Sequence, residues 1–259
     1  VFTLGERIKR DADRVDIAED PDDLGRSFIV KNDDGGGCLM PTAAAYGEWC
    51  LVYPQPDRVS DPAREGVLAT LQAFEDAATG PDPGDPQTGV FAHLDLDSAV
   101  DWVLLQELSK NNDAYFLSVH LYRDLDGPLR LLPWDLDLAY GGYPVNNCDA
   151  TGWVSYRTAM IQAFAATPEF QQRLVERWGE LRAGPLAEDA LLERVHTCRD
   201  ILGDEAHANF EVWAMDEIEF SWDGINWLCP VATYDEEMAR LDDWLVSRLA
   251  WMDANIQAF

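Results

Sequence analysis

The chain has 259 residues, of which 48 are Asp or Glu and 19 are Lys or Arg, giving a formal net charge of −29 at pH 7. This charge argues against nucleic acid or an anionic membrane as the main partner, and favours metal cations and basic protein segments. Hydrophobic residues make up 47% of the chain, yet no apolar stretch reaches the roughly 20 residues of a membrane-spanning helix. We therefore expect a folded globular protein that does not insert into a membrane, with solubility or salt adaptation explaining most of the charge.

The five cysteines are scattered without a Cys-x-x-Cys pair, and the four histidines lie apart, so a zinc site is not expected. Disulfides can form if the protein is exported, for example between Cys38 and Cys50, and the odd count leaves at least one thiol free. The cysteines alone leave the cellular compartment open.

The first 56 residues predict only short elements. Residues 1–8 (VFTLGERI) suggest a strand that already has neighbours, so we expect the chain to be a fragment or a processed form. Residues 9–26 form a charged segment that is helical or irregular. Residues 26–31 (RSFIVK) predict a short strand, which ends at the Gly-rich turn of residues 32–37. Residues 41–56 match no pattern.

Two helices are predicted next. Residues 60–80 start with Asp-Pro and carry apolar residues at helical spacing. A loop rich in Pro, Gly and Asp covers residues 80–89. The second helix spans residues 94–110, and we expect Asp97 or Ser98 to be its N-cap.

Two apolar, aromatic-rich runs at residues 111–123 and 129–140 are joined by an Asp-Gly turn, which predicts a β-hairpin. His120, in the first run, is expected to be a core or edge histidine rather than a catalytic base. The remainder is mostly helical, over residues 157–166, 168–183, 185–202, 205–216 and 233–257. The predicted fold is therefore α+β and predominantly helical, with a small hairpin and no internal repeat.

The second run of the hairpin, LRLLPWDLDLAYGG, carries Asp135 and Asp137 among apolar residues. In an extended chain the two carboxylates share one face, where their repulsion and lost solvation are costly without a counter-ion. The preceding DLDGPLRLLPWD does not match a calcium-binding EF-hand loop, because its Gly is at the fourth position and no Glu ends it.

Protein kinases place a catalytic-loop Asp, a metal-binding Asn five positions later, a short hairpin, and a metal-binding Asp before a Gly. Asp113, Ser118, Asp135 and Gly141 follow this order and spacing, although Ser118 is not an Asn. From the spacing alone, an acidic hairpin without catalytic function is the alternative.

The segment of residues 95–142 resembles the spore coat protein CotH kinase family. The similarity lies in an acidic-start helix, an Asn-x-Asp segment, a Leu-Tyr-Arg strand and a Pro-Trp-Asp-x-Asp strand that ends near Gly. Residues 5–31 (GERIKRDADRV…FIVK) and the final helix at 237–256 are similar to the family more loosely. The resemblance therefore covers most of the chain.

This resemblance implies an atypical kinase fold. It implies a hinge strand and the start of a lobe at residues 1–35, followed by a helical, kinase-like C-terminal lobe at residues 36–259. The lobe that covers the nucleotide, with its phosphate-binding lysine, is expected before Val1, because neither Lys9 nor Lys31 occupies that lysine's place in the sequence.

The resemblance also implies ATP-dependent phosphorylation of Ser or Thr in secreted or spore-coat proteins. Carried over by position, Asp113 is the catalytic aspartate, Asp135 holds Mg²⁺ or Mn²⁺, and Asp137 lies beside it. Ser118 takes the place of the metal-binding Asn, and Glu6 lies near the adenine of ATP. The implied location is extracellular, in the cell envelope or on the spore coat, and the negative charge favours basic, Ser- or Thr-bearing acceptor segments.

Two other functions compete with this one. A non-catalytic binding, scaffold or adhesion module that keeps the kinase-like fold is favoured by Ser118 and by the absence of the nucleotide-covering lobe from residues 1–259. A carbohydrate-associated module would use exposed tryptophans at 213, 222 and 227, although large aromatic residues are more often buried in a core.

Overall fold

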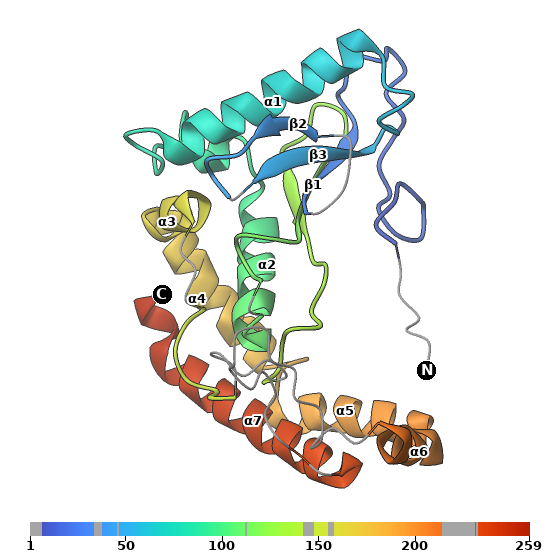
Figure 1. Cartoon of the computed structure of the whole chain (residues 1–259). Helices are drawn as coiled ribbons and strands as arrows, with labels where there is room; N and C mark the ends of the chain where they lie inside the picture. Colours follow the sequence, from blue (N-terminus) through green and yellow to red (C-terminus); the bar gives the residue numbers. More distant parts are fainter. Residues whose placement is uncertain are drawn as a thin grey trace, which may run out of the picture.

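The computed structural model describes residues 7–33, 38–45, 47–111, 113–141, 148–154, 158–213, 231 and 233–259. This part of the chain contains seven α-helices and a five-stranded antiparallel sheet (Figure 1). Helices account for 49% and strands for 13% of the described residues, so the fold is mixed and only roughly half helical. The kinase-like character of its larger part and the boundary at residue 35 stay predictions. The strand expected at residues 1–8 lies mostly outside the described residues.

The sheet is larger than the predicted hairpin. Its strands are β1 (Phe28–Asn32), β2 (Cys38–Pro41), β3 (Glu48–Tyr53), β4 (Val119–Arg123) and β5 (Arg130–Leu132). They are ordered β2-β3-β1-β4-β5, so β1 lies between β3 and the β4–β5 hairpin. The hairpin was predicted, but its pairing with β1 was not. This pairing brings the end of β1 to the segments that carry the acidic residues.

Strands β2 and β3 come from a region that matched no pattern in the sequence. In β3, Trp49, Cys50 and Leu51 are consecutive and buried, so the strand lacks the alternation that identifies a half-exposed strand. The expected Cys38–Cys50 disulfide is present and joins β2 to β3. Cys148 is also disulfide-bonded, and Cys198 is a free, exposed thiol.

The two helices that follow the sheet connect it to the rest of the molecule. Helix α1 (Asp61–Thr79) lies across the sheet, and α2 (Leu96–Ser109) runs from the sheet into the helical half (Figure 1). The expected N-cap of α2 is wrong: Asp95 caps it, accepting a hydrogen bond from the Ser98 backbone N–H at 2.8 Å. Asp97 lies in the first turn instead and pairs with Arg173.

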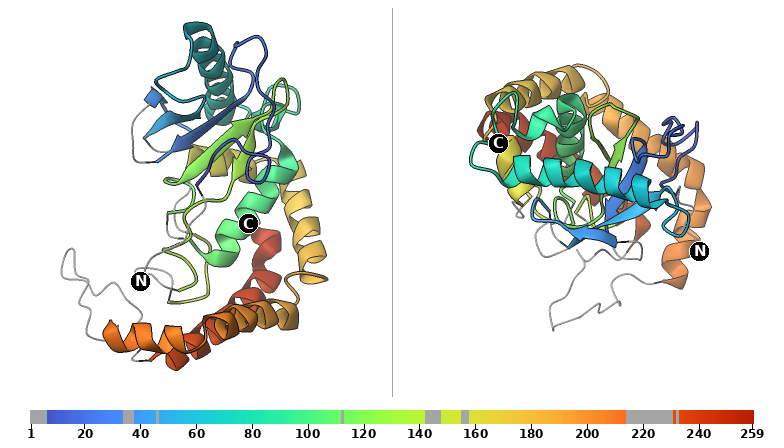
Figure 2. Two further views of the ribbon diagram at one scale, coloured as in Figure 1. Left: turned by 90° about the vertical axis from the view of Figure 1, so that its right-hand side faces the viewer. Right: turned by 90° about the horizontal axis from the view of Figure 1, so that it is seen from above.

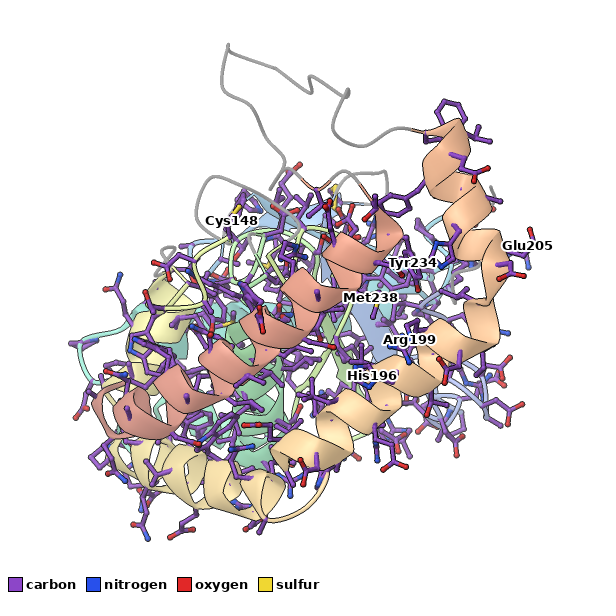
Figure 3. All side chains as sticks on the ribbon, turned by 90° about the horizontal axis from the view of Figure 1, so that it is seen from below. Cys148, His196, Arg199, Glu205, Tyr234 and Met238 are labelled. Atoms are coloured by element: carbon purple, nitrogen blue, oxygen red, sulfur yellow. A yellow bond between two sulfur atoms is a disulfide. The ribbon has the colours of Figure 1, made fainter. Side chains whose placement is uncertain are left out.

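The helical half contains the five helices expected from the sequence. These are α3 (Ala159–Ala165), α4 (Pro168–Arg182), α5 (Glu188–Leu202), α6 (Asp204–Val212) and α7 (Tyr234–Asn255). Helices α4 and α7 pack against α2, whereas α5 and α6 extend to one side along α7 (Figure 2). Figure 3 shows α5 and α6 beside the start of α7, where the His207 ring packs edge-on against Tyr234. None of the helices in the described ranges is long and apolar enough to cross a membrane.

A buried polar network fixes the C-terminal end of α2. The Arg248 guanidinium, from α7, is fully buried and donates hydrogen bonds to the backbone carbonyls of Glu107, Ala150 and Gly152. The Glu107 carboxylate accepts from Tyr115 Oη at 2.6 Å and lies 3.4 Å from Arg248 Nη2. Arg248 comes from α7, Glu107 from α2 and Tyr115 from the segment that follows α2, so the network joins these three parts of the chain. The two opposite charges compensate each other in the buried interior.

Candidate active site

The loop from α2 to β4 carries the first two residues predicted for the site. Helix α2 ends at Lys110, whose φ of 50° turns the chain away from the helix axis. Asp113 follows and is half-buried, and Tyr115 anchors the middle of the loop through its bond to Glu107. Ser118, buried and with φ of 54°, ends the loop immediately before β4.

The segment after β5 carries the other two predicted site residues, Asp135 and Asp137. The expectation that Asp135 and Asp137 share the face of a strand is wrong, because β5 ends at Leu132. Pro133, which has no N–H for a sheet ladder, comes next, and Asp135 has φ of 56°, in the left-handed region. The alternation of an extended chain therefore does not apply here.

These residues nevertheless converge. Asp137 raises the pKa of Asp135 through its charge and its proximity, and Ser118 Oγ lies 3.4 Å from Asp135 Oδ2. Burial raises the pKa of Asp113, and the nearby charges of Asp137, Asp135 and Asp33 raise it further. The loop before β4 and the segment after β5 thus bring their carboxyl groups within electrostatic reach of one another.

The pKa of Asp135 is also raised, by burial first and then by Asp137. Asp33 contributes to the raised pKa of both Asp113 and Asp135, although the sequence suggested only a solvated turn there. It follows the end of β1, and only the pairing of β1 with β4 could have revealed its place. Four carboxyl groups therefore repel one another in this region, an arrangement that a cation would stabilise.

One of these carboxyl groups, that of Asp33, lines a cavity of about 310 Å³, a volume at the lower end of the range for small-molecule sites. Lys31, Asp33, His120 and Trp134 contribute to its lining, together with apolar side chains of β3. Lys31 Nζ lies 3.8 Å from Asp33 Oδ2. Lys31 is opposite His120 across the β1–β4 ladder, so both side chains lie on one face of the sheet. The sequence assigned no role to this lysine.

His120 and Trp134 form one wall of the cavity. The His120 ring is buried, its Nδ1 lies 3.3 Å from the Ser118 carbonyl oxygen, and it packs edge-on against Trp134. Burial lowers the pKa of His120 to about 4, so the ring is neutral at pH 7. Trp134 packs against the small apolar cluster around Ile29 and also lines the cavity.

The oxygen atoms present fit a magnesium-type ion shared with a phosphate. In the described part of the chain, no three His, Cys, Asp or Glu side chains form a metal-binding group by themselves. Mg²⁺ is commonly held by one or two carboxylates, with waters and substrate phosphates completing its coordination. Asp135 and Asp137 are such a pair, and Ser118 adds a hydroxyl beside them.

One family model matches nearly the whole chain. The model of the family described as CotH kinase protein matches residues 1–252. The chain belongs to the CotH kinase family. The match extends over nearly all of the CotH kinase chain and confirms the resemblance found at residues 95–142. No curated protein matches the chain.

Four of the five predicted site residues of this CotH kinase family member are described: Asp113, Ser118, Asp135 and Asp137. Ser118 is hydrogen-bonded to Asp135, and the charges of Asp135 and Asp137 act on each other and on Asp113. Glu6, expected near the adenine, lies outside the described residues.

Proposed function

We propose that this member of the CotH kinase family is a metal-dependent protein kinase, which transfers the γ-phosphate of ATP to a Ser or Thr hydroxyl. The observation that carries the proposal is the convergence of Asp113, Asp135 and Asp137 beside a cavity lined by Lys31. Phosphoryl transfer depends mainly on positioning and on neutralising charge, so carboxylates, a cation and a lysine are a sufficient set of groups.

Asp113 is the proposed catalytic residue. The oxygen of the acceptor hydroxyl attacks the γ-phosphorus, the bond from that phosphorus to the bridging oxygen breaks, and ADP leaves. The hydroxyl proton passes to the Asp113 carboxylate. The raised pKa of Asp113, caused first by burial, makes its ionised form a better proton acceptor than an ordinary aspartate.

Asp135 and Asp137 would hold Mg²⁺ or Mn²⁺, with the Ser118 hydroxyl as a further oxygen donor. When bound, the ion supplies positive charge that offsets the negative charge of the phosphates. The acidic pair is suited to this role because the two carboxyl groups are close enough for Asp137 to raise the pKa of Asp135, and a cation would offset their repulsion.

The cavity beside the carboxyl groups is the proposed nucleotide site. Lys31 is the cation that would face the phosphates, and Asp33, 3.8 Å away, would orient it. The rings of His120 and Trp134 offer a wall against which the base can pack. Glu6 stays a predicted neighbour of the adenine.

The acceptor and the location follow from charge and from the disulfide. A net charge of −29 suits acceptor segments that are basic around their Ser or Thr. The Cys38–Cys50 disulfide supports an oxidising compartment, in agreement with an extracellular, cell-envelope or spore-coat location.

Transfer of labelled phosphate from ATP to a mixture of Lys/Arg-rich Ser and Thr peptides tests this function, with Mg²⁺ or Mn²⁺ present. We expect Asp113→Ala to reduce incorporation at least about 100-fold without a change in melting temperature. Asp126→Ala is the matched control, because Asp126 is an exposed carboxylate in the β4–β5 turn. Unchanged incorporation in Asp113→Ala would remove this residue from the mechanism.

A non-catalytic binding module is the second candidate, and the observation that favours it is Ser118. Its hydroxyl is a weaker metal ligand than the amide oxygen of Asn and lies 3.4 Å from Asp135 Oδ2. The two candidates differ in ligand binding. A kinase should show a rise in melting temperature with ATP and Mg²⁺, whereas a binding module without a nucleotide site should show none.

A further inference from the structure

One buried side chain connects the two acidic segments. Asn111, which follows α2, is 1% exposed. Its Nδ2 donates to the Asp135 backbone carbonyl at 3.1 Å and to Gln106 Oε1 at 3.0 Å. Its Oδ1 accepts from the Asp113 backbone N–H at 3.3 Å. The same amide is therefore bonded to the main chain of Asp113 on one side and to that of Asp135 on the other.

The two segments need such a connection. Asp135 has φ of 56°, and a left-handed backbone costs a non-glycine residue roughly 1–2 kcal/mol. The carboxyl groups on the two segments also carry like charges that repel one another, and that of Asp113 is half-buried. The repulsion acts to move Asp135 away from Asp113, and the backbone strain favours a different conformation at Asp135. A bond to the Asp135 carbonyl opposes both, because it holds the main chain and leaves the carboxylate available.

Asn111 is itself attached to a fixed part of the molecule. The neighbouring Lys110 Nζ donates to the carbonyls of Asp149 and Thr151, each at 2.6 Å. Arg248 Nη2 donates to the Glu107 carbonyl at 2.6 Å, in the last turn of α2. The end of α2 is therefore bonded both to α7 and to the segment of residues 148–154.

An amide is the group that these bonds require. The site uses a donor toward Asp135 and an acceptor toward Asp113 at the same time. A carboxylate has no N–H to donate and would add a charge to an already acidic region, whereas the Gln side chain is one methylene longer. Asn is the shorter of the two amide side chains, and the hydroxyl of Ser, which can also donate and accept, has a shorter reach.

We infer that Asn111 is a positioning residue, which sets the separation of Asp113 and Asp135 and thereby the affinity of the site for a divalent cation. The effect on cation affinity rests on the proposed function. The positioning of Asp113 and Asp135 by Asn111 does not, because it follows from the hydrogen bonds of Asn111. Groups that orient metal ligands from behind typically change metal affinity 10- to 100-fold when they are removed.

The test compares Asn111→Ala with the parent by two measurements. Electron paramagnetic resonance titration with Mn²⁺ gives the cation affinity, which we expect to weaken about tenfold or more. Amide hydrogen exchange without metal reports on the Asp113 N–H, which we expect to exchange at least about tenfold faster in the variant. Asn111→Ser, too short to reach Asp135, replaces Asn111→Ala if the latter does not fold.

Ser109→Ala is the matched control, because Ser109 is fully buried at the same end of α2 and its hydroxyl donates to the Gln106 carbonyl. It should lower stability without changing either measurement. A double-mutant cycle adds a second criterion: in an Asp135→Asn background, the Asn111→Ala change should no longer weaken Mn²⁺ binding.

Each outcome separates the inference from the proposed function. If the parent binds Mn²⁺ and Asn111→Ala binds it equally well, with unchanged exchange at Asp113, Asn111 is not a positioning residue. An equal loss of affinity in the Asp135→Asn background would also overturn the inference. A parent that binds no Mn²⁺ contradicts the proposed metal site, and hydrogen exchange at Asp113 then decides the role of Asn111.

Discussion

Buried polar side chains fix the position of the acidic loop relative to the helices. Arg248 is the largest of them, and burial lowers the pKa of its guanidinium to about 10. Its charge is compensated by Glu107 and by the carbonyls at the end of α2 and at residues 150 and 152. Removing one member of such a network leaves the other buried and uncompensated.

Arg248→Met should therefore lower the free energy of unfolding by about 3–5 kcal/mol. Arg173→Met is the control: Arg173 pairs with Asp97 and Glu180 on the surface, where ion pairs contribute about 0–1 kcal/mol. Urea denaturation measures both. Equal losses in the two variants would show that the buried network has no special role in stability.

His120 gives a pH dependence whose sign can be worked out. Burial lowers its pKa from 6.5 to about 4, so the folded state takes up a proton only at lower pH than the unfolded state. Well above pH 6.5 the ring is neutral in both states, so the pKa difference does not change the free energy of unfolding. Stability is lost as the pH falls from about 6.5 to about 4, by roughly 3 kcal/mol in total, and the loss then levels off.

In His120→Gln, the part of the acid destabilisation that comes from His120 should be absent. Between pH 7 and pH 5 the parent should lose about 2 kcal/mol more unfolding free energy than the variant, measured with urea at each pH. The same pH profile in both proteins would mean that His120 titrates alike in the folded and unfolded states.

The sequence identified the catalytic and metal-binding candidates but not the side chains that hold them. Asp113, Asp135 and Asp137 belong to a recognisable local pattern, which needs no knowledge of the fold. Lys31 and Asp33 reach the site only through the pairing of β1 with β4, about 90 residues apart in sequence. Asn111 stands next to the pattern, yet its role depends on a bond to Asp135, 24 residues later.

At the scale of elements, periodic helices were predictable because one apolar face and a start signal define them. The helices at 61–79, 96–109 and 234–255 follow their predicted ranges within a few residues. Strand β2 was missed because it has only four residues, and β3 because three consecutive buried residues replace the alternation of a half-exposed strand. The segment with Asp135 was misassigned because a left-handed backbone leaves no clear trace in the sequence.

The N-cap of α2 differs between the sequence, which favoured Asp97 or Ser98, and the structure, which has Asp95 at this position. Asp95 accepts a bond from the Ser98 N–H and pairs with Arg130, whereas Asp97 is a first-turn residue with an exposed ion pair. Asp95→Ala should cost about 1 kcal/mol of unfolding free energy. Asp97→Ala should cost less, roughly 0.5 kcal/mol or below, from its ion pair. Thermal melts of both variants measure the two losses of stability. A larger loss in Asp97→Ala than in Asp95→Ala would contradict the assignment of Asp95 as the N-cap.

At the scale of the whole molecule, the sheet and the helical half meet at the acidic site. Strand β1 supplies Lys31, the β4–β5 hairpin flanks the cavity, and the end of α2 positions the loop with Asp113. One apolar core runs from the sheet through α1 and α2 to α4 and α7, so the elements that carry the site are packed together. This arrangement gives the acidic residues a fixed separation.

In the proposed function, Asp135 and Asp137 hold a divalent cation that links the protein to a nucleotide. Isothermal titration calorimetry with ATP tests it most directly, in the presence of Mg²⁺ and then of excess chelator, on the parent and on Asp135→Asn. We expect the parent to bind ATP only when Mg²⁺ is present, and Asp135→Asn to bind it at least about tenfold more weakly. ATP binding of equal affinity with and without Mg²⁺, unchanged in Asp135→Asn, would contradict it.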